Sequence, residues 1–158
     1  MLIYHNQKNN KSTIPTTISL NEKNRILVIS GPNAGGKTVT LKTVGLLQLM
    51  VQSGLLVPVH PESTFGLFKQ LMIHIGDTQS LEYDLSTYSS HLLHMKYFME
   101  NANGRTLFFI DELGSGSDPN LGGAFAEVIL QELVKKHSLG IVTTHYLNLK
   151  VMANHTPG

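Results

Sequence analysis

The chain has 158 residues, a formal net charge of +1, 41% hydrophobic and 15% charged residues, and no cysteine. This length suits a single domain with its own core, and the composition excludes disulfides and thiolate metal sites. The near-neutral charge is not that of a domain that binds nucleic acid by itself. No run of eighteen apolar residues and no basic, apolar leader occurs, so we expect a cytoplasmic protein without a membrane partner.

The first half of the chain alternates between predicted strands and helices. A polar stretch over residues 5–13 is expected to be a loop. The elements that follow are a short edge strand over 14–20, a strand over 25–30, a helix from Val39 to about Gln52, and strands over 55–59 and 69–75. The apolar positions of that helix predict one buried face, formed by Leu41, Val44, Leu47 or Gln48, and Val51.

The second half continues the same alternation. We expect a polar loop over 77–88, a helix over 89–101, a buried strand over 106–110, a helix from Pro119 to about Lys136, a strand over 139–144 and a helix over 146–153. Asp118 would cap the second of these helices, and its buried stripe is expected at Leu121, Phe125, Val128 and Leu133. The chain is therefore predicted to be α/β, one domain over 1–158, with a mostly parallel sheet flanked by helices.

Residues 31–38 have the sequence Gly-Pro-Asn-Ala-Gly-Gly-Lys-Thr, a phosphate-binding loop of the form G-x-x-x-x-G-K-[ST]. The loop lies between a predicted strand and a predicted helix, as the motif requires. Its backbone N–H groups and the helix N-terminus would bind phosphate oxygens. Lys37 would contact the β- and γ-phosphates, and the Thr38 hydroxyl would ligate Mg²⁺. The predicted ATP-binding set is Gly31, Pro32, Asn33, Ala34, Gly35, Gly36, Lys37, Thr38 and Val39.

Two carboxylates follow the buried strand over 106–110. Asp111 is expected to hold Mg²⁺ together with Thr38, directly or through water. Glu112 is expected to act as the general base that polarises an attacking water. An acid that activates water is needed for hydrolysis and is dispensable for many kinases, so the pair favours an ATPase.

His145 ends the strand over 139–144, in the run Thr143-Thr144-His145. If the sheet order brings this strand end beside the phosphate-binding loop, His145 can hydrogen-bond the γ-phosphate or the water. A histidine at a strand end is often only structural, and the two neighbouring motifs favour the functional interpretation. The predicted catalytic residues are thus Lys37, Glu112 and His145. The Gly-rich turn over 114–119 could line a subunit boundary.

The segment over 84–91, Asp-Leu-Ser-Thr-Tyr-Ser-Ser-His, precedes a predicted helix. Its hydroxyl residues are ordinary caps or, alternatively, a phosphate-contacting helix N-terminus. If the sheet separates this helix from its own loop, the phosphate it contacts belongs to a second copy of the chain. We therefore predict a homodimer with composite ATP sites, in which Ser86, Thr87 and Ser89 act in trans.

Other side chains give weaker signals. His91 and His94 lie one helical turn apart, but no third ligand is evident, so a metal site there is disfavoured. Tyr97, Phe98 and Met99 are expected in the core or an interface. Arg25 and Arg105 are the only arginines, which leaves no arginine-rich lid for a kinase.

The motifs at 31–38, 84–91, 111–119 and 143–145 together resemble the ATPase domain of MutS proteins, over about residues 14–154. The runs Asp-Glu-Leu-Gly-x-Gly-x-Asp-Pro and Leu-Ser-Thr-Tyr-Ser-Ser-His are closer to the bacterial type-two branch than to the mismatch-recognising branch. The resemblance implies a P-loop fold of ABC-ATPase type. It also implies that Ser86 is the signature serine offered to the partner's γ-phosphate and His145 the switch histidine.

The same resemblance implies partners and further domains. Type-two members are linked to branched DNA, recombination control, nuclease action through an Smr domain, and rescue of collided ribosomes. The long core and clamp domains of the family and the Smr domain have no counterpart in this sequence, so it is expected to be a fragment of a larger protein. DNA or ribosome contact would belong to those absent domains. The alternatives are a nucleotide-binding switch or assembly module with little hydrolysis, and a small-molecule kinase.

Overall fold

Parallel strands alternate with helices in the computed structural model, which describes residues 6, 8–9, 13–32, 35–75, 84–115 and 119–158. For 84–88 and 119–120 the description is of the backbone. In chain order the elements are β1 (Ile26–Ser30), α2 (Lys37–Gln52), β2 (Gln70–His74), α3 (Asp84–Asn101), β3 (Thr106–Ile110), α4 (Pro119–Lys135), β4 (Leu139–Thr144) and α5 (Leu147–His155). The predicted α/β class with a parallel sheet is confirmed.

The strand order in the sheet is β1-β4-β3-β2. All neighbouring pairs are parallel, with Ser30 opposite Thr144 and Val142 opposite Ile110. Because parallel strands end at the same edge of a sheet, the segments that follow β1, β3 and β4 meet there. The last strand in the sequence lies between the first strand and β3, so His145 follows a strand adjacent to the phosphate-binding loop.

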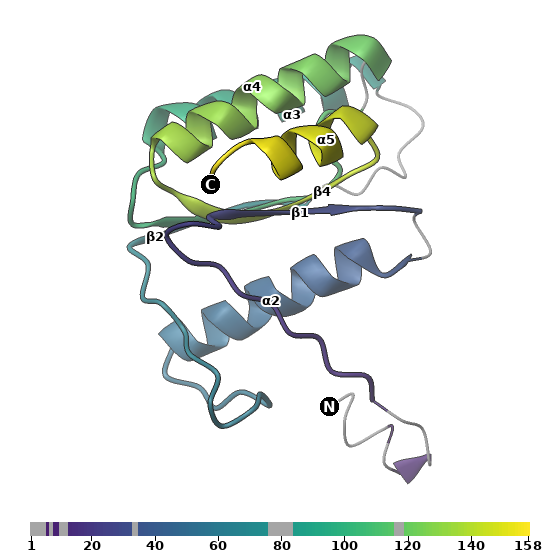
Figure 1. Ribbon diagram of the computed structural model, residues 1–158. Coiled ribbons are helices and arrows are strands. Elements are labelled where there is room, and N and C mark those ends of the chain that lie inside the picture. Colours follow the sequence, from purple (N-terminus) through teal and green to yellow (C-terminus); the bar gives the residue numbers. More distant parts are fainter. Residues whose placement is uncertain (1–5, 7, 10–12, 33–34, 76–83, 116–118) are drawn as a thin grey trace.

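Helices cover both faces of the sheet (Figure 1). On one face lies α2, and on the other lie α3, α4 and α5. The alternation of side chains along β3 separates two clusters: Leu107 and Phe109 pack on the α2 side, and Phe108 and Ile110 pack on the other. All residues of β3 are buried, as the continuous apolar run predicts for a strand covered on both faces.

Two predicted strands are absent, and these predictions were wrong. Residues 14–20 form no strand, although Ile18 and Leu20 pack against the cluster on the α2 side. Residues 55–59 also form none, and Leu56 is 96% exposed. Apolar alternation makes a strand only where another strand pairs with its backbone groups. Instead, the side chains of α2 hold the connection to β2: Gln48 Nε2 donates to Gly66 O at 2.8 Å.

Two helix predictions also need correction. The helix expected to start at residue 89 begins at Asp84, so the end of the predicted loop is helical, while residues 77–83 lie outside the described part. On α4, Leu121 and Val128 are exposed, whereas Phe125 is partly buried and Leu133 fully buried. The buried hydrophobic side chains of α4 are those of Ala126, Ile129, Leu130 and Leu133. These side chains face the core because α4 packs against both α3 and α5. The periodicity of apolar residues in the sequence does not show which neighbours a helix has, so it did not predict this orientation.

We predict that Gly140→Ala destabilises the fold. A Cβ built on Gly140 would overlap the ring of Phe108, which is fully buried in the core. Overpacking of this kind costs about 1–3 kcal/mol, read as a lower urea midpoint. The control is Gly104→Ala, whose Cβ would meet its nearest neighbour at 3.8 Å. Equal midpoints for the two variants would contradict the expected clash.

Candidate functional site

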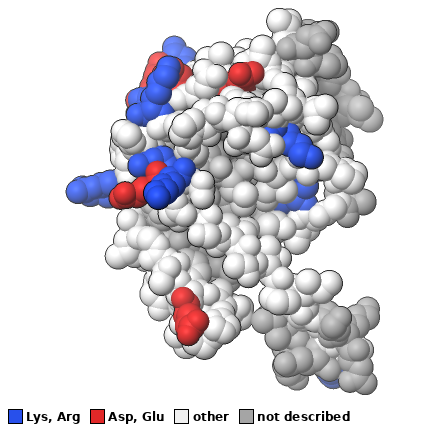
Figure 2. Space-filling view, viewed as in Figure 1, with Lys and Arg blue, Asp and Glu red and all other residues white. Residues whose placement is uncertain are grey.

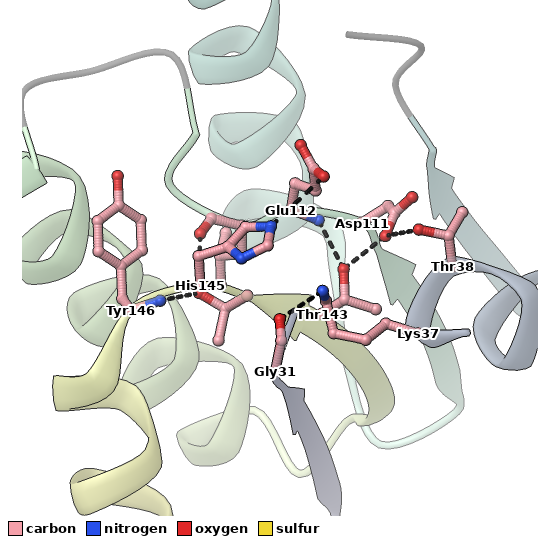
Figure 3. A network of polar contacts seen from close by, with 10 residues as sticks. Gly31, Lys37, Thr38, Asp111, Glu112, Thr143, His145 and Tyr146 are labelled. Carbon is pink, nitrogen blue, oxygen red and sulfur yellow. Dashed lines mark hydrogen bonds and ion pairs between the residues drawn. The ribbon is translucent and has the colours of Figure 1, made fainter. Parts of the chain in front are cut away.

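The site is built at the edge of the sheet where β1, β3 and β4 end (Figure 3). The phosphate-binding loop follows β1, Asp111 and Glu112 follow β3, and His145 follows β4. The sheet order therefore brings together three motifs that are far apart in the sequence.

The phosphate-binding loop leads directly into α2. Gly36 caps the helix with φ 75°, and Gly31 has φ 145°, values that favour glycine. Lys37 is buried, and its Nζ donates to Gly31 O at 2.6 Å, so the ammonium group lies back over the loop. Asn33 and Ala34 lie outside the described residues, and Val39 is exposed on the first turn of α2. The helix N-terminus and the Lys37 ammonium group contribute positive potential at this end of the sheet.

Asp111 joins the ends of three segments. Its Oδ1 accepts from Thr38 Oγ1 at 3.1 Å and from Thr143 Oγ1 at 2.5 Å, and its own N–H donates to His74 O at 2.9 Å. Carboxylate and hydroxyl oxygens side by side are the donors that Mg²⁺ prefers, so Thr38 and Asp111 fit such an ion. The structure thus brings the two predicted metal ligands together.

Sequence reasoning did not assign a role to Thr143. Its hydroxyl donates to Asp111 Oδ1 and accepts from the Glu112 N–H at 2.8 Å, so one fully buried side chain contacts the carboxylate of Asp111 and the backbone of Glu112. A hydroxyl side chain near the end of a predicted strand, two residues before His145, indicated a possible site residue. Its contact with the two acids could not be predicted, because that contact depends on the sheet order, which places β4 against β3.

Glu112 and His145 face one another across this edge (Figure 3). The distance from His145 Nε2 to Glu112 Oε1 is 3.6 Å, and this contact is an ion pair when the imidazole is protonated. Both side chains are part-exposed, at 23% for Glu112 and 44% for His145, and are thus accessible to water. Glu112 has φ 51°, a left-handed conformation that is uncommon for a residue with a side chain.

The turn after Glu112 contacts the end of β4 and the residues just after it. Leu113 N donates to Thr143 O at 2.9 Å, Thr144 Oγ1 to Leu113 O at 3.3 Å, and Tyr146 Oη to Gly114 O at 2.9 Å. Tyr146 was not among the predicted site residues, although it directly follows the predicted catalytic residue His145.

The predicted trans residues lie on α3. Ser86 and Thr87 are in its first turn, where the description is of the backbone, and Ser89 is exposed. Helices α3 and α2 cover opposite faces of the sheet (Figure 1). Within one chain the sheet therefore separates α3 from the helix that carries Lys37 and Thr38.

Three histidines meet where β2 ends against α3. His74 Nε2 and His91 Nδ1 are 2.7 Å apart, and the rings of His74 and His94 have centroids 4.8 Å apart. Burial lowers the pKa of His91 to about 4, with a further contribution from His74 and His94. In the described part of the chain, no group of three His, Asp or Glu side chains is placed so that it could hold a metal ion. Burial and the neighbouring His94 also lower the pKa of His74, so His74 and His91 are neutral packing groups near pH 7.

We predict that this cluster makes the fold sensitive to acid. The pKa of His91 is 6.5 when unperturbed and about 4 in the fold. Between these pH values His91 is therefore protonated in the unfolded chain and neutral in the folded chain, which favours unfolding. Stability then falls as the pH drops from about 6.5 to 4, by up to about 3 kcal/mol. Urea midpoints of the wild type and His91→Gln across this range measure the effect, with His155→Gln as an exposed control. Equal pH dependence in all three proteins would contradict it.

The family model described as MutS domain V matches residues 27–158. The chain is 49% identical over 148 residues to Endonuclease MutS2 of Thermomicrobium roseum, covering 94% of this chain and 19% of that protein. It is 46% identical over 146 residues to Endonuclease MutS2 of Carboxydothermus hydrogenoformans, covering 92% and 19%. Endonuclease MutS2 of Leuconostoc mesenteroides is 42% identical over 154 residues, with 98% and 19% covered. The chain thus spans about a fifth of the length of these relatives.

Proposed function

This chain belongs to the MutS family, through its domain V, and from that premise we propose that it binds ATP with Mg²⁺ and hydrolyses it as the motor domain of a MutS2-type DNA-processing protein. The observation that carries the proposal is the meeting of Lys37, Thr38, Asp111 and Glu112 at one sheet edge. The order β1-β4-β3-β2, with one strand between the loop strand and the acid strand, supports a P-loop fold of ABC-ATPase type.

Binding is assigned to the loop and the start of α2. The backbone N–H groups of the residues from Gly31 to Val39, except Pro32, which has none, donate to the phosphates. Lys37 exchanges its bond to Gly31 O for the β- and γ-phosphate oxygens. Thr38 and Asp111 would hold Mg²⁺. A bound ion there would supply positive charge that offsets the negative charge of the phosphates.

Hydrolysis is assigned to Glu112 and His145. The Glu112 carboxylate accepts a proton from a water that attacks the γ-phosphorus in line, and the part-exposed position of the side chain gives water access to it. His145, 3.6 Å from Glu112, orients the carboxylate and hydrogen-bonds the water or the γ-phosphate. Thr143 keeps both acids in place through its hydroxyl.

A second copy of the chain completes the site in this proposal. The placement of α2 and α3 on opposite faces supports a homodimer in which Ser86, Thr87 and Ser89 reach the partner's γ-phosphate. Mixing Ser86→Ala chains with Lys37→Ala chains tests this arrangement. Each variant alone should be nearly inactive, while the mixture recovers turnover at sites that combine an intact loop with an intact Ser86. A mixture no more active than its parts would remove Ser86 from the partner's site.

DNA or ribosome contact is assigned to domains that the full-length relatives contain and this chain does not span. The lysines and arginines on the face in Figure 2 lie in small groups, some beside acidic side chains, on a mostly uncharged surface. A surface of this kind lacks the continuous basic stripe that phosphate-backbone binding requires. Among the described residues, no helix is long and apolar enough to cross a membrane.

Phosphate release from ATP, measured with Mg²⁺ and with EDTA, tests the proposal. Wild-type chain should release phosphate only with the metal. Asp111→Asn should reduce both the rate and the response to Mg²⁺, because one of the two proposed ligands loses its charge. Metal-independent release, or an Asp111→Asn variant with the wild-type rate, would contradict the assigned metal site.

A nucleotide-binding switch is the second candidate. The separation of α2 and α3 by the sheet favours it for an isolated chain, which would bind ATP without the partner's hydroxyl groups. Tight ATP binding with no phosphate release at any chain concentration would support the switch. A kinase is not supported: Arg25 donates to His137 O and Arg105 precedes β3, so both arginines lie at the edge of the sheet opposite the loop.

A further inference from the structure

We propose that Tyr146 is a positioning residue that holds Glu112 in its working orientation by clamping the turn of residues 112–115, called here the acid turn. This inference rests on the proposed ATPase function, because it assigns a source for the geometry of the proposed base. Tyr146 follows His145 and lies beside the acid turn in Figure 3.

The acid turn needs an external restraint. Glu112 has φ 51°, which costs a non-glycine residue roughly 1 kcal/mol or more, so the turn relaxes unless neighbouring groups hold it. One local bond is present, from Ser115 N to Glu112 O at 3.0 Å. Further hydrogen bonds to the turn involve Thr143, Thr144 and Tyr146, at the end of β4 and just after it.

Thr143, Thr144 and Tyr146 contact different parts of the acid turn. Thr143 and Thr144 hold the start of the turn, at the Glu112 N–H and at Leu113, and both side chains are fully buried. Tyr146 holds its far end, where Oη donates to Gly114 O at 2.9 Å. The Tyr146 N–H donates to Thr144 Oγ1 at 3.1 Å, which fixes the tyrosine backbone to the same group of contacts.

The tyrosine ring also confines the turn sterically. Gly114 has φ 87°, and a Cβ there would lie 2.7 Å from Tyr146 Cε2 and 2.6 Å from Gly122 O on α4. Gly114 is thus enclosed between the ring and the helix. The ring itself packs against the core cluster of α3, α4 and α5, which restricts its movement away from Gly114.

A clamp on the acid turn acts on the chemical step more than on nucleotide binding. The phosphate-binding loop lies between β1 and α2, and Lys37 begins α2. The side-chain and backbone hydrogen bonds of Tyr146 go instead to Gly114 O and Thr144 Oγ1. Glu112 is two residues before the clamped carbonyl of Gly114. Loosening that end lets the carboxylate leave the orientation in which it faces His145 at 3.6 Å.

Tyr146→Phe tests the clamp, since it keeps the ring and removes the hydroxyl. We expect kcat for ATP to fall roughly fivefold with KM within about twofold, and hydrogen exchange of peptides covering 112–115 to rise about fivefold, as for loss of one hydrogen bond. Tyr97→Phe, on the exposed surface of α3, is the matched control and should change neither. Gly114→Ala, which crowds the ring, should also lower kcat.

The double variant with Glu112→Gln separates positioning from general stability. If Tyr146 acts through Glu112, Tyr146→Phe in the Glu112→Gln background lowers kcat less than about twofold further. Full additivity, an unchanged kcat, or a rise in KM that matches the fall in kcat would overturn the clamp. If wild type releases no phosphate, the proposed function fails, and the exchange data alone decide: faster exchange in Tyr146→Phe supports the clamp and equal exchange overturns it.

Discussion

Replacing Lys37 by alanine is expected to weaken ATP binding at least about 30-fold and to remove phosphate release. The side chain is 5% exposed, and its ammonium group is 2.6 Å from Gly31 O, within the loop that would surround the phosphates. Loss of a desolvated, charge-assisted hydrogen bond costs about 2–5 kcal/mol, which gives the expected change in affinity. Titration with a fluorescent ATP analogue measures the binding.

Lys42→Ala is the matched control for that change. Lys42 is an exposed lysine on the same helix, five residues after Lys37, and its removal changes the net charge equally. It should bind ATP as the wild type does. Equal weakening in both variants would mean that the effect comes from overall charge, and wild-type affinity in Lys37→Ala would remove the lysine from the site.

Glu112→Gln should leave ATP bound and unhydrolysed. The substitution keeps the size of the side chain and removes its ability to accept a proton, so kcat is expected to fall about 10²- to 10⁴-fold. Binding affinity should remain within about threefold, because the phosphate contacts belong to the loop. Single-turnover kinetics with separate measurement of bound ATP distinguish the two effects.

The partly buried Glu127 on α4 supplies the control, as Glu127→Gln removes an acid from another surface. That variant should turn over ATP normally. If Glu112→Gln hydrolysed ATP at the wild-type rate, the base would have to be another group. If it lost ATP binding instead, Glu112 would contribute to binding and not to the chemical step.

The contiguous motifs of this chain were predicted from the sequence because each depends only on the residues directly before and after it. The loop over 31–38 requires a strand before it and a helix after it, and β1 and α2 provide them. The continuous apolar run over 106–110 predicted a strand buried on both faces, and β3 is one. The hydrogen bond of 3.1 Å between Thr38 and Asp111 joins the two predicted motifs, and their role as a metal pair stays a prediction.

Features that depend on neighbours in space were predicted less well. The strand expected over 14–20 lacks a pairing partner, and the buried sector of α4 depends on its contacts with α3 and α5. The role of Thr143 and the contact of Tyr146 with Gly114 depend on β4 lying beside β3. A single sequence gives the elements of a parallel sheet without their order, and the order decides which side chains meet.

The rate of phosphate release per chain, measured over a range of chain concentrations with Mg²⁺-ATP, tests the central claim most directly. Lys37→Ala serves as the blank. A composite site predicts release above the blank, with a rate per chain that rises with concentration and levels off once dimers are saturated. Release no greater than that of Lys37→Ala at every concentration, with ATP bound by the wild type, would contradict the ATPase account and leave a nucleotide-binding switch.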